Sequence, residues 1–190
     1  MAIPDLTPVV EALLFGAGKP LDVAQLAEIT ETDVPAVQAA LDALRMQCDA
    51  QHRGIFLQEV AGGYQLRTRP EYAEALRKLG RQRPFRFSRA ALESLAIIAY
   101  RQPITRPEVE YLRGVDSGSV LKTLMEKRLV RILGKKDVPG KPMIYGTTTQ
   151  FLELFGLADL ASLPTLQEFS ELVDDEGPAV PLPGLDEQDE

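Results

Sequence analysis

The pattern of apolar and polar positions in this chain repeats once, at a constant offset of 83 residues. Few of the superposed residues are identical, but apolar residues fall on apolar residues and helix-capping residues on capping residues, without a gap. Correspondence of this kind at one offset indicates two copies of one structural unit. The superposed pairs are Pro20 with Pro103, Leu21 with Ile104, Leu26 with Val109, Ile29 with Leu112, Asp33 with Asp116, Val37 with Val120, and Leu41 with Leu124.

Each copy contains the pattern of three successive helices. Apolar side chains three and four positions apart indicate the first and third helices, and a break with Gly or Pro follows the first. Side chains that can accept hydrogen bonds from the free backbone N–H groups of a first helical turn predict where the second and third helices start. The first-helix positions are Val9, Val10, Leu13 and Leu14, then Leu92, Leu95, Ala96 and Ala99. The second helix is expected to start at Asp22 with Gln25 in the first copy and at Thr105 with Glu108 in the second, and the third helix at Asp33 and at Asp116. The apolar stripe of the first copy's third helix consists of Val34, Val37, Leu41, Leu44 and Cys48.

Runs of β-prone residues, separated by turns rich in Gly and Pro, predict one hairpin in each copy. Each hairpin leads into a final helix. Three helices followed by a hairpin is the order of a winged helix, which is a helix-turn-helix with an appended β-hairpin. The expected strands are 55–60 with 64–68 and 129–133 with 143–147, and the expected final helices are 71–79 and 149–155.

The predicted fold class is therefore mainly α with small β-hairpins (α+β), arranged as two tandem winged-helix domains. We expect an N-terminal domain at 1–80, a linker at 81–87 and a C-terminal domain at 88–156. Residues 157–190 are rich in Pro, with ten acidic residues and no basic one, which predicts an acidic and mostly disordered tail.

The net charge of −7 is unevenly distributed along the sequence. Residues 1–80 carry −4, residues 81–156 carry +7 and residues 157–190 carry −10. Such asymmetry bears on partners rather than on fold. The sequence has no apolar run of membrane-spanning length and no signal-peptide pattern at its start, so we expect a cytoplasmic protein without a membrane partner.

Residues able to carry chemistry are scarce and scattered. The one histidine, His52, sits at the end of a predicted helix, without a serine or cysteine pattern that would form a triad. The one cysteine, Cys48, excludes an internal disulfide and is too few for a cysteine-based zinc site. The GAGKP stretch lacks the spacing of a phosphate-binding loop. We therefore expect a protein that is not an enzyme, with no cofactor or metal.

Nucleic-acid binding is the alternative that the charges raise, because winged helices often place their third helix in the major groove. The third helix of the first copy carries acidic side chains, which phosphates repel. The second copy is more basic, and a regulator that binds DNA is the second candidate function. Its possible phosphate contacts are Lys122, Arg131, Lys135, Lys136 and Lys141.

Three long stretches of the chain resemble one known family. They read EALLFGAGKPLDVAQLAEI, GIFLQEVAGGYQLRTRPEYAEALRKL, and SRAALESLAIIAYRQPITRPEVEYLRGVDSGSVLKTLMEKRLVRILGKKDVPGKPMIYGTT. With these stretches the chain is similar, from about Val9 to Phe155, to the segregation and condensation protein B (ScpB) family. Proteins of this family are "kite" subunits of the bacterial condensin built from an SMC ATPase and the kleisin ScpA.

The resemblance implies a non-catalytic accessory subunit for chromosome condensation, partition and the cell division cycle. Such a subunit forms a homodimer, largely through its first domain, and binds ScpA, which connects it to SMC; its association with DNA is then mainly indirect. We expect apolar positions of the first domain to form the dimer. We expect the kleisin-binding residues to be Tyr100, Arg101, Gln102, Ile104 and Arg106, although Ile104 could instead complete the core.

Overall fold

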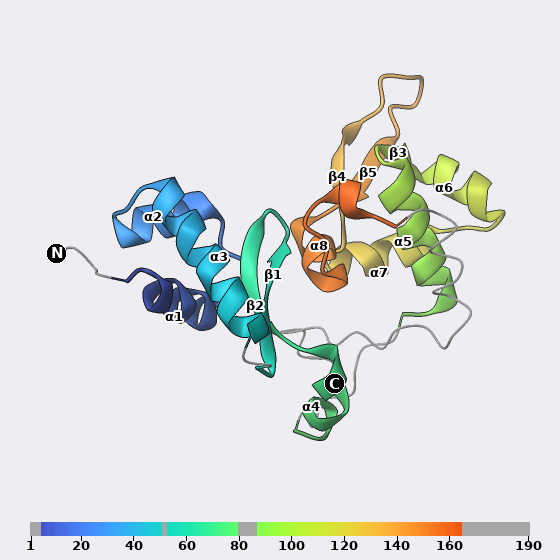
Figure 1. Cartoon of the computed structure of the whole chain (residues 1–190). Coiled ribbons are helices and arrows are strands. Elements are labelled where there is room, and N and C mark those ends of the chain that lie inside the picture. The colour runs from blue at the N-terminus through green and yellow to red at the C-terminus, as the bar shows by residue number, and fades with distance from the viewer. Residues whose placement is uncertain (1–4, 51–52, 80–86, 165–190) are drawn as a thin grey trace. The chain divides into compact units, whose positions relative to one another are not determined.

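The computed structural model describes residues 5–50, 53–79 and 87–164. These residues form two compact units, which are described separately (Figure 1). The first unit contains 5–50, 53–79 and 156–162, and the second contains 87–155 and 163–164. His52 and residues 165–190, most of the predicted tail, lie outside the described residues.

The first unit is a three-helix cluster with a β-hairpin. Helix α3 packs against α1, α2 and strand β1, so it forms the centre of this unit. Capping starts both later helices as predicted: Asp22 and Gln25 form a capping box on α2, and Asp33 Oδ1 accepts from Ala36 N at 2.9 Å. The elements are α1 (Thr7–Ala17), α2 (Val23–Thr30), α3 (Val34–Ala50), β1 (Ile55–Val60), β2 (Gly63–Thr68), the 3₁₀ turn η1 (Pro70–Tyr72) and α4 (Ala73–Leu79).

The core of the first unit follows the predicted apolar stripe with one exception. Four of the five stripe residues on α3 are buried, whereas Val34, at the first position of the helix, is 52% exposed. Cys48 is among the buried residues, and its burial raises the pKa of its thiol. The core contains Val10, Leu14, Leu21, Leu26, Val37, Ala40, Leu41, Leu44, Cys48 and Leu57.

The second unit repeats this order around helix α5, which packs against α6, α7 and β5. The predicted capping box is present, because Thr105 N donates to Glu108 Oε2 at 2.8 Å. The third helix begins later than expected: Asp116 Oδ1 accepts from Gly118 N at 3.1 Å, and α7 starts at Gly118. The elements are α5 (Arg89–Arg101), β3 (Ile104–Thr105), α6 (Arg106–Arg113), α7 (Gly118–Glu126), β4 (Val130–Lys135), β5 (Met143–Thr147) and α8 (Thr149–Phe155).

A short strand between the first two helices was missed by the sequence pattern. Strand β3 pairs antiparallel with β5, with Ile104 opposite Tyr145, so the second unit has a three-stranded sheet in the order β3-β5-β4. In the first unit, Leu21 forms an isolated bridge with Tyr64 of β2. Leu21 and Ile104 are superposed by the 83-residue offset, so the repeat extends to this backbone pairing.

The first unit also includes a segment that the sequence analysis placed in the acidic tail. The carbonyl groups of Leu157 and Ala158 accept from Ala61 N at 2.8 Å and Gly62 N at 2.9 Å, at the turn of the β1–β2 hairpin. Gln58 Nε2 donates to the carbonyl of Gly156 at 2.9 Å. A 3₁₀ turn, η2 (Leu160–Ser162), follows. The expected boundary between the second domain and the tail, at residue 157, therefore differs from the structure, in which residues 156–162 belong to the first unit.

Candidate binding surfaces of the second unit

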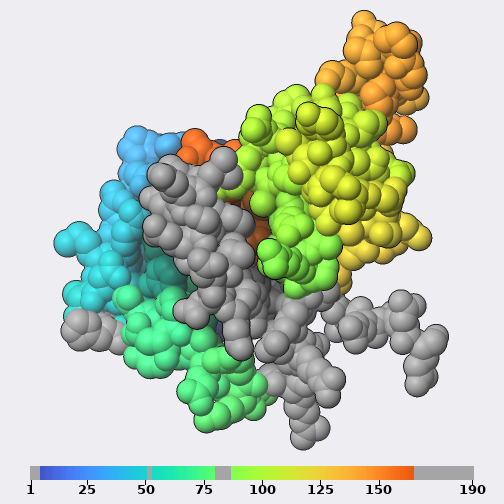
Figure 2. Space-filling model, turned by 90° about the vertical axis from the view of Figure 1, so that its right-hand side faces the viewer, coloured from blue at the N-terminus to red at the C-terminus, as the bar shows by residue number. Residues whose placement is uncertain are grey.

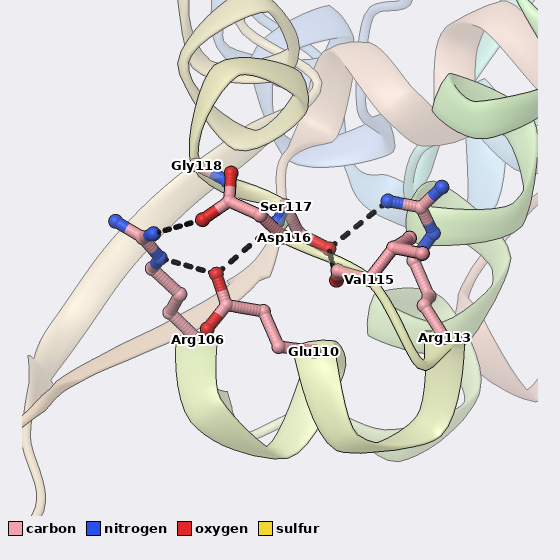
Figure 3. A network of polar contacts seen from close by, with 7 residues as sticks. All are labelled: Arg106, Glu110, Arg113, Val115, Asp116, Ser117 and Gly118. Atoms are coloured by element: carbon pink, nitrogen blue, oxygen red, sulfur yellow. Dashed lines mark hydrogen bonds and ion pairs between the residues drawn. The ribbon is translucent and has the colours of Figure 1, made fainter.

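A network of charged and polar groups fixes the turn between α6 and α7 (Figure 3). Arg106 connects both sides of the turn, because its guanidinium lies 2.6 Å from Glu110 Oε1 on α6 and 2.6 Å from Asp116 Oδ2 in the turn. Glu110 Oε1 also accepts from Ser117 N at 3.1 Å. A Cβ at position 118 would lie 3.0 Å from the Arg106 guanidinium, which favours the glycine found there.

The charges of this network stabilise one another. Hydrogen bonding to Glu110 is the main cause that raises the pKa of Arg106, and the Gly118 N–H is the main cause that lowers the pKa of Asp116, with Arg106 adding to it. On the inner side, Arg113 Nη1 donates to Ser117 Oγ at 3.0 Å (Figure 3). The Arg113 side chain is 6% exposed, and its Nε has no hydrogen-bond partner within the described residues.

The five residues predicted to bind a kleisin occupy different environments. Ile104 is 4% exposed and belongs to the core, so it was wrongly included as a surface contact. Gln102 is bonded to the sheet, since Thr147 N donates to its Oε1 at 2.8 Å. The Tyr100 hydroxyl donates to the carbonyl of Pro164, and Arg106 belongs to the α6–α7 network. Arg101, at the end of α5, is exposed.

The five predicted phosphate contacts also separate into two groups. Lys136 Nζ lies 2.6 Å from Glu108 Oε1 and Lys122 Nζ lies 3.7 Å from Glu126 Oε1, so their charges are already paired. The other three lie on the β4–β5 hairpin or its loop, where every residue of 131–141 is exposed. These three are Arg131, Lys135 and Lys141.

Exposed apolar side chains mark a surface that the sequence analysis did not select. Tyr111, Leu112 and Val115, at the end of α6 and in the following turn, are 86%, 48% and 55% exposed. Leu112 is superposed on Ile29 of the first copy, which is also exposed on its second helix. The shared apolar position lies at the surface in both units. Contiguous exposed apolar residues are typical of contact surfaces for other proteins.

Two further properties bear on the kind of protein. Within residues 5–50, 53–79 and 87–164, no group of three or more His, Cys, Asp or Glu residues is arranged to hold a metal ion. In the same part of the chain, no helix combines the length and apolar character needed to span a bilayer.

Comparisons with known proteins agree on one family. The family "Segregation and condensation complex subunit ScpB" has a model that matches residues 8–166. The segregation and condensation protein B of Syntrophotalea carbinolica is 56% identical over 168 residues, which are 88% of this chain and 85% of that protein.

Two solved structures are also similar. The crystal structure of ScpB from Mycobacterium tuberculosis is 34% identical, and the match covers 83% of this chain and 98% of that one with a TM-score of 0.40. A dimer of the ScpB N-terminal domain complexed with a ScpA peptide is 37% identical and covers 39% of this chain and 93% of that one, with a TM-score of 0.37. Since the family model and the bacterial relative both span most of its sequence, this chain belongs to the family of the segregation and condensation complex subunit ScpB.

Proposed function

We propose that this chain is a non-catalytic accessory subunit of an SMC–ScpA–ScpB complex, which supports chromosome condensation and segregation in the cytoplasm at the nucleoid. Membership of the ScpB family carries this proposal. In each unit the order of three helices and a hairpin, with a short backbone pairing after the first helix, supports a pair of winged-helix domains.

The proposed assembly is a homodimer that binds the kleisin ScpA and reaches SMC through it. A relative of the first domain has been crystallised as a dimer with a ScpA peptide, and this arrangement is what we transfer to the present chain. The first unit offers exposed apolar side chains for self-association, with Phe15 of α1 80% exposed and Met46 of α3 72% exposed. Exposed aromatic and methionine residues are enriched at protein interfaces.

For ScpA binding, Arg101 is the direct contact that we retain from the predicted set. Its guanidinium is exposed at the end of α5, beside Tyr100 in sequence, and arginine with tyrosine is a frequent pair among residues that dominate binding energy. Gln102 and Arg106 act as positioning residues, because their side chains bond to β5 and to the α6–α7 turn. The exposed α6 residues Tyr111 and Leu112 are further apolar candidates for a contact with ScpA.

Capture of ScpA from the same genome tests the proposal. The tagged full chain should retain ScpA, and Arg101→Glu should weaken retention by about tenfold, which corresponds to one lost contact of roughly 1.4 kcal/mol. Arg89→Glu is the matched control, because Arg89 lies at the other end of α5 and is 92% exposed. A wild-type chain that retains no ScpA would contradict the proposed function, and equal losses in both variants would remove Arg101 from the site.

A further inference from the structure

An open pocket of about 290 Å³ lies at the base of the β4–β5 hairpin in the second unit. It is lined by two arginines, two threonines and a glutamine, so every lining side chain is polar and two are cationic. The pocket is far larger than the roughly 30 Å³ that one water molecule occupies, and it can hold a tetrahedral oxyanion. Its lining residues are Arg128, Arg131, Thr148, Thr149 and Gln150.

Backbone and side-chain bonds hold the two sides of this pocket together. Arg128 follows α7 with a φ of 56°, a left-handed conformation that turns the chain into β4. Thr148 Oγ1 donates to the carbonyl of Arg128, and the same hydroxyl accepts from Phe151 N at 3.2 Å. Arg131 lies on β4 opposite Gly146 of β5. The backbone at both arginines and the Thr148 hydroxyl are therefore held in place before any ligand arrives.

The two arginines differ from four other cations of this unit, which are paired with carboxylates. Arg89, Arg106, Lys122 and Lys136 each lie within 4.0 Å of a carboxylate, whereas no such ion pair joins Arg128 or Arg131 to another described residue. Two guanidinium groups without a carboxylate partner, beside hydroxyl and amide donors, supply the kinds of donor that a phosphate accepts in several charge-assisted hydrogen bonds.

The hairpin above the pocket continues the positive charge. Figure 2 shows it as the orange projection from the second unit's surface, and its Lys135 and Lys141 are exposed. Arg131 and Lys135 are four residues apart on a strand, roughly 13 Å at the usual rise per residue. A nucleic-acid strand carries a phosphate about every 3.4 Å along the helix axis, so a row of this length spans several phosphates.

We propose that the Arg128–Arg131 pocket binds a phosphate of a nucleic-acid backbone, with Lys135 and Lys141 contacting neighbouring phosphates. The pocket gives this chain a direct contact with DNA, in addition to any contact through its partners. Contacts of this kind position a protein without reading bases, so binding is independent of sequence. An acidic polypeptide offers carboxylates instead, and residues 157–190 with a charge of −10 are such a segment. The pocket favours nucleic acid because one phosphate can accept charge-assisted hydrogen bonds from both arginines that line it.

Fluorescence anisotropy of the full chain with a 30-base-pair duplex of arbitrary sequence, between 50 and 200 mM salt, tests this proposal. The wild type should bind at 50 mM salt and lose affinity as salt rises. The double variant Arg128→Gln/Arg131→Gln should bind at least tenfold more weakly. The slope of log affinity against log salt should fall by about one, because the two arginines hold one phosphate. Glutamine also carries a Cβ, so the backbone conformation at position 128 remains equally populated.

The matched control is Arg89→Gln/Lys122→Gln, which removes the same charge from the same unit outside the pocket. It should change affinity less than threefold. Absent binding by the wild type at 50 mM salt would overturn the proposal, as would equal losses in both double variants. Pocket-dependent binding of a poly-glutamate peptide with no binding of the duplex would also overturn it, in favour of an acidic polypeptide ligand. Capture of ScpA by the pocket variant should be unchanged, so the two proposals fail separately.

Discussion

Lys136 of the β4–β5 hairpin donates to Glu108 of α6, with Nζ and Oε1 2.6 Å apart. Glu108 also caps its own helix by accepting from the backbone of Thr105. These bonds, with Lys136 as the first cause, lower the pKa of Glu108 from 4.5 to about 2. One carboxylate thus joins the start of the second helix to the hairpin.

The acid stability of the second unit should depend on this carboxylate. A carboxyl group with a lowered pKa in the folded state stabilises the fold above pH 4.5, and this contribution is lost as the pH falls towards 2. Chemical denaturation between pH 6 and 3 should therefore show a smaller loss of unfolding free energy for Glu108→Gln than for the wild type. Glu126→Gln, whose partner Lys122 is 3.7 Å away, is the control and should retain the wild-type slope; identical slopes for wild type and Glu108→Gln would contradict the assignment.

Arg106 should be needed for the stability of the α6–α7 turn rather than for direct partner contact. Arg106→Gln removes both ion pairs of the network and should lower the thermal midpoint, whereas Arg101→Gln should leave it unchanged. Calorimetry of the two variants gives the comparison. If Arg106→Gln unfolded at the wild-type temperature, the network would have no structural role.

Gly63 should tolerate no side chain, because the backbone of Leu21 and Asp22 passes close to it. A Cβ there would lie 2.8 Å from the carbonyl carbon and oxygen of Leu21, which are backbone atoms. Gly63→Ala should therefore destabilise the first unit by about 1–3 kcal/mol in denaturant unfolding. Gly16→Ala in α1 has nothing within 4 Å and should be neutral or stabilising by up to about 1 kcal/mol. Equal effects of the two changes would refute the close approach.

Substitutions of Leu44 and Phe15 should affect folding and self-association separately. Leu44 is fully buried on α3, so Leu44→Ala should cost about 3 kcal/mol of unfolding free energy. Phe15 is 80% exposed, so Phe15→Ala should leave the monomer's fold intact and weaken the dimer. Circular dichroism and sedimentation velocity measure the two properties, and an unchanged dimer would place the interface elsewhere.

Local sequence signals predicted the regular elements well. The capping pairs Asp22 with Gln25 and Thr105 with Glu108 act within one helical turn, and both are present in the structure. Strand β5 and helix α8 have the predicted bounds. A stretch rich in Gly and Pro precedes β5, and Gly156 follows α8. The two-residue strand β3 was missed because a strand that short has no period to detect.

The surface was harder to predict because it depends on contacts distant in sequence. Ile104 and Gln102 flank Pro103 like exposed loop residues, yet one is buried and the other bonds to β5, 45 residues later. Lys136 was predicted as a phosphate contact, but its charge is paired with Glu108, 28 residues earlier in the sequence. The pocket at the base of the β4–β5 hairpin combines Arg128 with Thr148, and a linear sequence gives no signal for that approach. The apolar residue Leu112 matched its repeat partner but faces outwards.

Sedimentation velocity of the full chain, alone and with ScpA, tests the central claim most directly. Alone, the chain should sediment at twice its mass of 20.9 kDa, and added ScpA should shift all of it into a heavier species. The full chain is required because residues 156–162 belong to the first unit. A 20.9 kDa species that sediments independently of ScpA at tens of micromolar would contradict the proposed role as a dimeric kleisin-binding subunit.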